Sequence, residues 1–423
     1  MQANGIFTDI EDMKKTAKRL FLVAALLMGC SMIWGQNAGQ MPSGEQNPFP
    51  EKYYHLSTRG SLKNSLLKFE RGGEARVAFL GGSITEMTGW HNKLMDFFTK
   101  RFPQTKFDFV EAGIASMGST PHAFRLVNDV LKKGKLDLIF FEATVNDETN
   151  GFTPTEQVRA VEGVVRHIWN NDPETDIIIM HFTRDYFVDM VAKGQLPDVV
   201  LNHERVANYY AVPTVNMVQE ISERILDGEF EWKDFGGDHP SPMGQNYYTA
   251  SMLRLMGLMW SDRKQTDTIK PHAIPEKQLD EFSYVNGDFL DIREARLGKG
   301  WALVPKWHPQ DQAGTRNGFV DVPMLETMQA GSRLTLDFSG RAIGICCVAG
   351  PSAGILEYSV DGGPTRQLDT FTFWSGGLYI PWVYMLETEL QPGNHRLILK
   401  MSAQKNERSA GTACQIRNFV VNR

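Results

Sequence analysis

The sequence predicts an α/β domain followed by an all-β sandwich, and three observations support this fold class. The chain has 423 residues, more than one ordinary domain needs, and 42% of them are hydrophobic, which suffices for two substantial cores. Up to about Trp260, short apolar runs alternate with amphipathic stretches, as strands alternate with helices. Beyond Lys277 the helical periodicity nearly disappears, and alternating strand-like runs take over.

Residues 1–35 have the character of an export signal. Met13 and a group of basic residues precede an apolar run, Leu20–Met28, that ends in small and polar residues. We therefore expect translation to begin at Met13 and cleavage to fall near Gly35. The run is shorter than the roughly 20 residues that a membrane-spanning helix needs, so no stable transmembrane span is expected. Alternatively, Cys30 ends a lipobox-like segment and serves as a lipid anchor; either route exports the protein to the periplasm or out of the cell.

Residues 36–52, rich in Gly, Pro, Gln and Asn, predict a flexible leader, and residues 53–262 predict the first domain. The strands predicted for this domain are Arg76–Leu80, Phe107–Glu111, Leu136–Phe141, Asp176–His181 and Val212–Val215. The helices predicted are Trp90–Phe102, Pro121–Lys133, Thr155–Asn170, His203–Tyr210 and Tyr247–Met259. This repeated alternation implies a parallel sheet covered on both faces.

A polar linker, residues 263–285, separates the first domain from a predicted β-sandwich at residues 286–423. Its strand-like runs include Arg333–Phe338, Ile343–Val348, Ile355–Val360, Trp382–Glu387 and His395–Met401. Turns rich in Gly and Pro separate these runs, which is typical of an antiparallel sandwich.

The cysteines and tryptophans of the second domain favour structural interpretations. Buried thiols at Cys346, Cys347 and Cys414 are favoured over a disulfide from Cys414 to one of the adjacent pair, because these three are an odd number once Cys30 is set aside with the signal. Core packing is favoured over stacking on sugar rings for each of Trp301, Trp307, Trp374 and Trp382.

The formal net charge of −6 argues against a nucleic-acid partner, because binding of that kind normally leaves a basic stripe of Lys and Arg. Small or neutral polymeric substrates fit this charge better. The oligomeric state is not fixed by the sequence.

Residues that can take part in catalysis follow the predicted strands. Ser83 follows the first strand through two glycines, Gly113 follows the second, and Asn146 follows the third. His239, beside Asp238, lies on a loop before the last helix of the domain. Taken singly, these signals are more typical of a turn, a helix cap and a solvated histidine than of a catalytic site. Together they lie where open α/β sheets bind ligands, at the carboxyl ends of parallel strands.

In this order the four positions resemble the blocks of the SGNH (GDSL-type) hydrolases, over about residues 76–260. The resemblance implies a three-layer α/β/α sandwich similar to flavodoxin's, and ester hydrolysis without a metal or other cofactor. Ser83 then acts as nucleophile and His239 as general base. The N–H groups of Ser83 and Gly113 and the side chain of Asn146 form the oxyanion hole.

Two positions depart from the family pattern. Gly82 stands where the nominal Gly-Asp-Ser-Leu block has its Asp, and Gly236 stands three residues before the histidine, where most members have the triad Asp. Asp238 is the first candidate for the missing acid and Asp234 the second; a dyad of Ser83 and His239 supported by a backbone carbonyl is the third alternative. Neighbouring side chains in an extended segment point to opposite sides, so Asp238 can orient the His239 ring only if the loop is tightly curled.

Two other sites have structural interpretations. For Glu142, a structural ion pair with Arg125 or Arg184 is favoured over a position facing the cleft. His203-Glu204 lacks the second histidine of a zinc-protease signature, so a structural or cleft-lining role is expected.

Three functions therefore remain. The favoured one is an exported esterase that removes acetyl or similar small acyl groups from glycans. The second is a lipid or thioester acyl hydrolase of the same family. The third is a non-catalytic glycan-binding protein, in which the displaced Asp marks a degenerate site.

Overall fold

The structure is a computed structural model, and it describes residues 50–423. The predicted signal at 1–35, the start at Met13, the lipid anchor at Cys30 and nearly all of the leader lie outside these residues. Within residues 50–423, no helix combines the length and apolar character that crossing a membrane requires.

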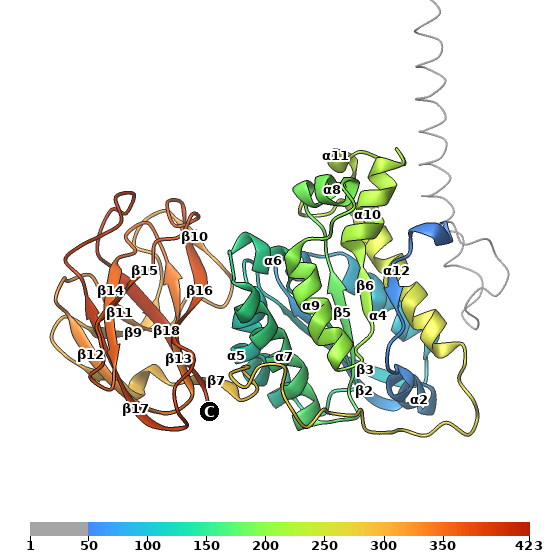
Figure 1. Ribbon diagram of the computed structural model, residues 1–423, viewed down its shortest axis with the longest axis horizontal. Helices are drawn as coiled ribbons and strands as arrows, with labels where there is room; N and C mark the ends of the chain where they lie inside the picture. Colours follow the sequence, from blue (N-terminus) through green and yellow to red (C-terminus); the bar gives the residue numbers. More distant parts are fainter. Residues whose placement is uncertain (1–49) are drawn as a thin grey trace, which may run out of the picture.

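The first domain contains a sheet of five parallel strands with one antiparallel edge strand (Figure 1). The strand order is β1-β6-β5-β4-β2-β3. The bounds are β1 (Leu56–Ser57), β2 (Gly73–Gly81), β3 (Thr105–Gly113), β4 (Leu138–Glu142), β5 (Asp176–His181) and β6 (Thr214–Asn216). Apart from β1, this is the flavodoxin-like order, so the predicted fold class is confirmed.

Helices cover both faces of the sheet. One face packs against α5 (Ser119–Asp129), α7 (Pro154–Asn171) and α9 (Asp198–Tyr209). The other packs against α2 (Lys63–Arg71), α4 (Trp90–Arg101), α10 (Met217–Leu226) and α12 (Pro242–Trp260). The sequence predicts α4, α5, α7, α9 and α12 but misses α2 and α10. The fold therefore has the three layers that the resemblance implies.

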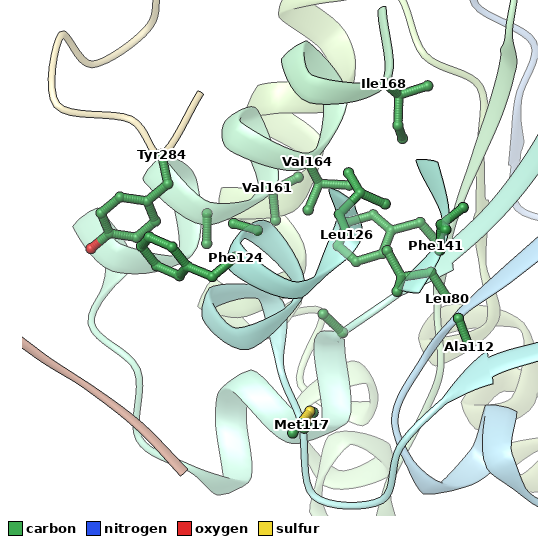
Figure 2. Packing of buried hydrophobic residues seen from close by; sticks show 14 of the residues in the cluster. Leu80, Ala112, Met117, Phe124, Leu126, Phe141, Val161, Val164, Ile168 and Tyr284 are labelled. Carbon is green, nitrogen blue, oxygen red and sulfur yellow. The ribbon is translucent and has the colours of Figure 1, made fainter. Parts of the chain in front are cut away.

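Apolar packing fixes α5 and α7 on their face of the sheet. Figure 2 shows this contact, whose labelled members include Leu80, Phe124, Leu126, Phe141, Val161 and Val164. Burial of one such side chain stabilises the fold by about 1.5–3 kcal/mol. The start of α7 is set locally, since Thr153 accepts the N–H of Glu156 at 3.2 Å and Pro154 occupies the first turn.

Four short helices lie beyond the carboxyl ends of the strands: α3 (Ser83–Glu86), α6 (Thr144–Thr149), α8 (Asp185–Ala192) and α11 (Trp232–Phe235). Three further turns are 3₁₀ helices, η1 (Glu51–Tyr53), η2 (Leu131–Lys133) and η3 (Ile292–Glu294). The short helices α3 and α6 follow β2 and β4 directly, and they carry Ser83 and Asn146 to the same edge of the sheet.

The second domain is a sandwich of two sheets, as predicted, and its inner faces share one core. One sheet has the order β10-β16-β13-β18-β11-β9, with β7 on β18, and the other has the order β15-β14-β17-β12-β8. The bounds are β7 (Gly287–Leu290), β8 (Arg296–Leu297), β9 (Ala302–Trp307), β10 (Gly314–Thr315), β11 (Val322–Thr327), β12 (Arg333–Gly340), β13 (Ala342–Ala349), β14 (Ile355–Val360), β15 (Arg366–Asp369), β16 (Leu378–Glu387), β17 (Gly393–Met401) and β18 (Cys414–Asn422). Among the named strands of this domain within residues 50–423, only the pair β10–β16 is parallel.

The thiols of the second domain are free and buried, which confirms the favoured interpretation of Cys346, Cys347 and Cys414. Among the tryptophans the expectation of core packing is confirmed for Trp301 and Trp307, which are buried. It is wrong for Trp374, which is 43% exposed on a loop before β16 and contacts the exposed ring of Phe373.

The two domains dock along α5 and α7 (Figure 1). The ring of Phe124 on α5 lies 5.0 Å from that of Tyr284, at the end of the linker. Arg159 on α7 pairs with Asp280 at 2.9 Å and with Glu389 of the sandwich at 2.6 Å. The interface therefore combines apolar packing with ion pairs, which holds the sandwich beside the α/β domain.

Candidate active site

A tight turn between β2 and α3 presents Ser83. A Cβ atom added at Gly81 would lie 2.1 Å from Oε1 of Glu142, and one added at Gly82 would lie 1.9 Å from Oδ1 of Asn146. A side chain at either position would have to displace one of these two side chains. Ser83 begins α3 and remains partly exposed at the sheet edge.

His239 meets Ser83 directly. Its Nε2 lies 2.8 Å from the Ser83 Oγ, although the two residues are 156 positions apart. This distance is within the range of about 2.6–3.2 Å expected for a nucleophile and its base. The loop is fixed just beyond the histidine, where Ser241 donates its N–H to the Phe235 carbonyl at 2.7 Å and caps α12.

Gly113 and Asn146 lie against the nucleophile turn. Gly113 ends β3 opposite Gly81, and a Cβ atom added to it would lie 2.3 Å from the N atom of Glu86 on α3. Asn146, in the first half of α6, has its carboxamide against Gly82. The structure therefore brings together the residues that the sequence names for the oxyanion hole; their catalytic role stays a prediction.

Neither candidate acid bonds the His239 ring within residues 50–423. Asp238 accepts the Asp185 N–H at 3.4 Å, and its other oxygen lies 3.7 Å from Nη2 of Arg184. Asp234 accepts the N–H of Glu231 at 3.1 Å, where it caps α11. The Asp238 and Asp234 side chains are thus bonded elsewhere, and which of the three alternatives holds stays a prediction.

The position of the family's acid is closed by the backbone. Gly236 has φ +105°, and a Cβ atom there would lie 2.1 Å from the N atom of Ser241. A side chain at 236 therefore collides with the start of α12. The backbone of this loop therefore leaves no space for the family's acid, so the absence of the Asp involves more than the exchange of one side chain.

Glu142 holds the nucleophile turn, and the predicted ion pair with Arg125 or Arg184 is wrong. Its Oε1 accepts the N–H of Gly82 at 2.6 Å and the hydroxyl of Thr85 at 2.7 Å. Burial raises the pKa of this carboxyl to about 7. The preference for hydrogen bonds over an ion pair follows from its place at the end of β4, directly under the turn.

A buried polar network supports α6 from behind. Asp147 accepts the N–H and hydroxyl of Ser119, both at 2.6 Å, and lies 2.8 Å from Nε2 of His203. His181 in turn contacts Glu204 at 2.8 Å. His203 and Glu204 thus have structural roles, as expected, and within residues 50–423 no group of three or more candidate ligands is placed to hold a metal.

The loop after Gly113 carries a feature that the sequence does not signal. Ser116 is in the left-handed region with φ +73°, which costs a non-glycine residue about 1–2 kcal/mol. Its N–H has no hydrogen-bond partner within the described chain. Strained backbone of this kind clusters at functional sites. Position 116 is neither glycine nor proline, so the sequence does not predict this turn.

Fold and site together define an α/β hydrolytic domain with a serine–histidine pair at the carboxyl edge of its sheet. Residues 79–247 match the model of the GDSL-like lipase/acylhydrolase family. The α/β domain belongs to this family, and the chain is a carboxylic ester hydrolase.

Solved structures share the two-domain architecture. The chain is similar to a two-domain esterase (CEX) active on acetylated mannans, co-crystallized with mannopentaose, at a TM-score of 0.70 and 20% identity, over 88% of this chain and 97% of that one. A second structure of a two-domain esterase (CEX) active on acetylated mannans gives 0.69 and 20%, over 85% and 94%. A comparison with curated protein sequences finds no match. At this identity the similarity concerns the fold.

Proposed function

We propose that the protein is an exported serine esterase that removes acetyl groups from carbohydrate. The observation that carries this proposal is the 2.8 Å contact between Ser83 Oγ and His239 Nε2. A hydroxyl in this contact can pass its proton to the imidazole as it attacks an ester carbonyl. Export rests on the signal-like character of residues 1–35.

The reaction follows the acyl-enzyme route. Ser83 Oγ bonds to the acetyl carbon while His239 Nε2 takes the hydroxyl proton. His239 then gives this proton to the sugar oxygen as the ester bond breaks. A water molecule then bonds to the acetyl carbon while His239 Nε2 takes its proton, and the bond from this carbon to Ser83 Oγ breaks. His239 gives the proton to Oγ, which releases acetate and restores Ser83. The N–H groups of Ser83 and Gly113 and the Asn146 amide stabilise the oxyanion.

Two features favour a substituent on a polymer as the substrate. His239 is exposed and Ser83 partly exposed, so a short acyl group on a bulky chain can reach the pair. The solved two-domain structures with similar architecture are of an esterase active on acetylated mannans. Asp238 keeps its place in the proposal as the acid to be tested, with Asp234 and the simple dyad as alternatives.

The test is release of acetate from an acetylated mannan. We expect turnover by the wild-type protein and its loss in Ser83→Ala, while Ser261→Ala, at the far end of α12, stays active. A series of nitrophenyl esters from acetyl to palmitoyl separates the alternatives, because a preference for long chains contradicts the glycan substrate. Failure of Ser83 to react with a fluorophosphonate probe points instead to a non-catalytic glycan-binding protein.

A further inference from the structure

The loop 114–118 lines the nucleophile turn on one side. The N–H of Ile114 donates to the Gly81 carbonyl at 3.0 Å, and the N–H of Ala115 donates to the side chain of Glu86 at 3.2 Å. The carbonyl oxygen of Met117 lies 3.3 Å from the position of a Cβ at Gly82. A displacement of this loop therefore reaches the residues on either side of Ser83.

Ser116, at the tip of this loop, is held by one hydrogen bond from each domain. Its carbonyl accepts the side-chain N–H of Asn150, the residue that ends α6, at 3.0 Å. Its hydroxyl accepts Nη2 of Arg316, which comes from the β-sandwich 200 residues away, also at 3.0 Å. Because the left-handed conformation of Ser116 is strained, it persists only while its surroundings hold it.

The β-sandwich presents Arg316 through an unusual element. Arg316 directly follows β10, the two-residue strand that pairs in parallel with β16, and Thr315 bonds the Tyr379 carbonyl at 2.7 Å. In Figure 1 both strands lie at the side of the sandwich that faces α6. At the same side, the ring of Trp382 on β16 packs edge-on against Phe152, 6.4 Å between centroids. The sandwich thus contacts the loop that follows Gly113 and the segment that follows α6, the helix that carries Asn146.

We infer that Arg316 is a positioning residue for ester hydrolysis: through Ser116 it holds the loop 114–118 against the nucleophile turn, so that the β-sandwich completes the active site. The inference rests on the proposed function, because it assigns a role in that reaction. Arg316 does not touch the reacting atoms and acts through the hydroxyl of Ser116. The Nε of Arg316 is buried and has no hydrogen-bond partner among the described residues. This agrees with a side chain whose position is set by the hydrogen bond from its Nη2.

The experiment uses the full chain and nitrophenyl acetate, a substrate without sugar. We expect Arg316→Ala to lower kcat by about 10-fold or more with KM within about 2-fold, since small misplacements of catalytic groups cost up to about 10²-fold. Ser116→Ala removes the same hydrogen bond from the other side and gives the same loss. Arg316→Lys, which keeps a donor, recovers part of it.

The matched control is Arg341→Ala. Arg341 also lies in the sandwich and bonds Glu281 of the linker at 3.0 and 3.1 Å, but it contacts none of the catalytic loops. Its kcat should stay at the wild-type value. The double variant R316A/S116A should be no worse than either single variant, because one interaction is removed in each case.

Full kcat in Arg316→Ala, or losses that multiply in the double variant, would overturn the inference while leaving the proposed function intact. If Arg316→Ala fails to fold, Ser116→Ala decides by the same criterion. A wild-type protein that does not hydrolyse the ester, or a Ser83→Ala variant that does, overturns the proposed function and this inference with it.

Discussion

The carboxyl group of Glu142 accepts the backbone N–H of Gly82 at 2.6 Å, one residue before the proposed nucleophile. The same oxygen accepts the hydroxyl of Thr85, so a single buried side chain fixes both ends of the turn that carries Ser83. The turn thus depends on an acceptor at position 142, whereas it does not depend on a negative charge there.

Glu142→Gln should keep this acceptor and change the pH dependence of stability. Burial raises the pKa of Glu142 to about 7, above its ordinary value near 4.5. A raised folded-state pKa gives stability that is fully present below about pH 4.5 and lost as pH rises toward 7. In thermal unfolding from pH 4 to 8, the melting temperature of the Gln variant should therefore rise relative to that of the wild type across that window. Turnover should change little.

The controls for this prediction are Glu142→Ala and Glu407→Gln. The Ala variant loses both hydrogen bonds of the turn and should lose most activity. Glu407 is exposed, and its Gln variant should track the wild type at every pH. A constant difference in melting temperature between Glu142→Gln and the wild type would contradict the assignment.

Asn146→Ala should lower kcat by about 10²–10³-fold with little change in KM, because an oxyanion-hole donor acts mainly in the transition state. The carboxamide lies against Gly82, close to the nucleophile, and makes no hydrogen bond within residues 50–423. Steady-state hydrolysis of nitrophenyl acetate measures the effect. Asn171→Ala, at the end of α7, serves as control. A loss of less than about 3-fold would remove Asn146 from the oxyanion hole.

The long apolar strands and the order of the four blocks are readable from the sequence, because buried parallel strands leave continuous apolar runs such as Ile177–Met180. The residues that shape the site are less readable. Helices α3 and α6 have four and six residues, too few to show a periodicity. The left-handed turn at Ser116 and its bond to Arg316 depend on contacts between domains, which no local pattern encodes.

Asp238→Asn should lower kcat/KM by less than about 10-fold. The Asp238 carboxylate faces Arg184 and the Asp185 N–H, and it makes no bond to the His239 ring among the described residues. Asp234→Asn should cost even less, since this side chain only caps α11. A loss near 10⁴-fold in Asp238→Asn, the size expected when a triad acid is neutralised, would restore Asp238 as the partner of His239.

Gly236→Asp tests whether the family's acid can be put back. The backbone at 236 has φ +105°, and the added Cβ would lie 2.1 Å from the Ser241 N atom, so the new side chain must displace the loop that carries His239. We expect a lower melting temperature and a loss of turnover of 10-fold or more, in line with the cost of misplacing a catalytic group. Gly237→Asp is the matched control, because its φ is +80° but its Cβ meets nothing within 4 Å. That variant should bear only the backbone strain of about 1–2 kcal/mol and keep most of its activity. Turnover above the wild-type value in Gly236→Asp would mean that the loop can adopt the family's geometry and that the dyad is merely a triad with its acid removed.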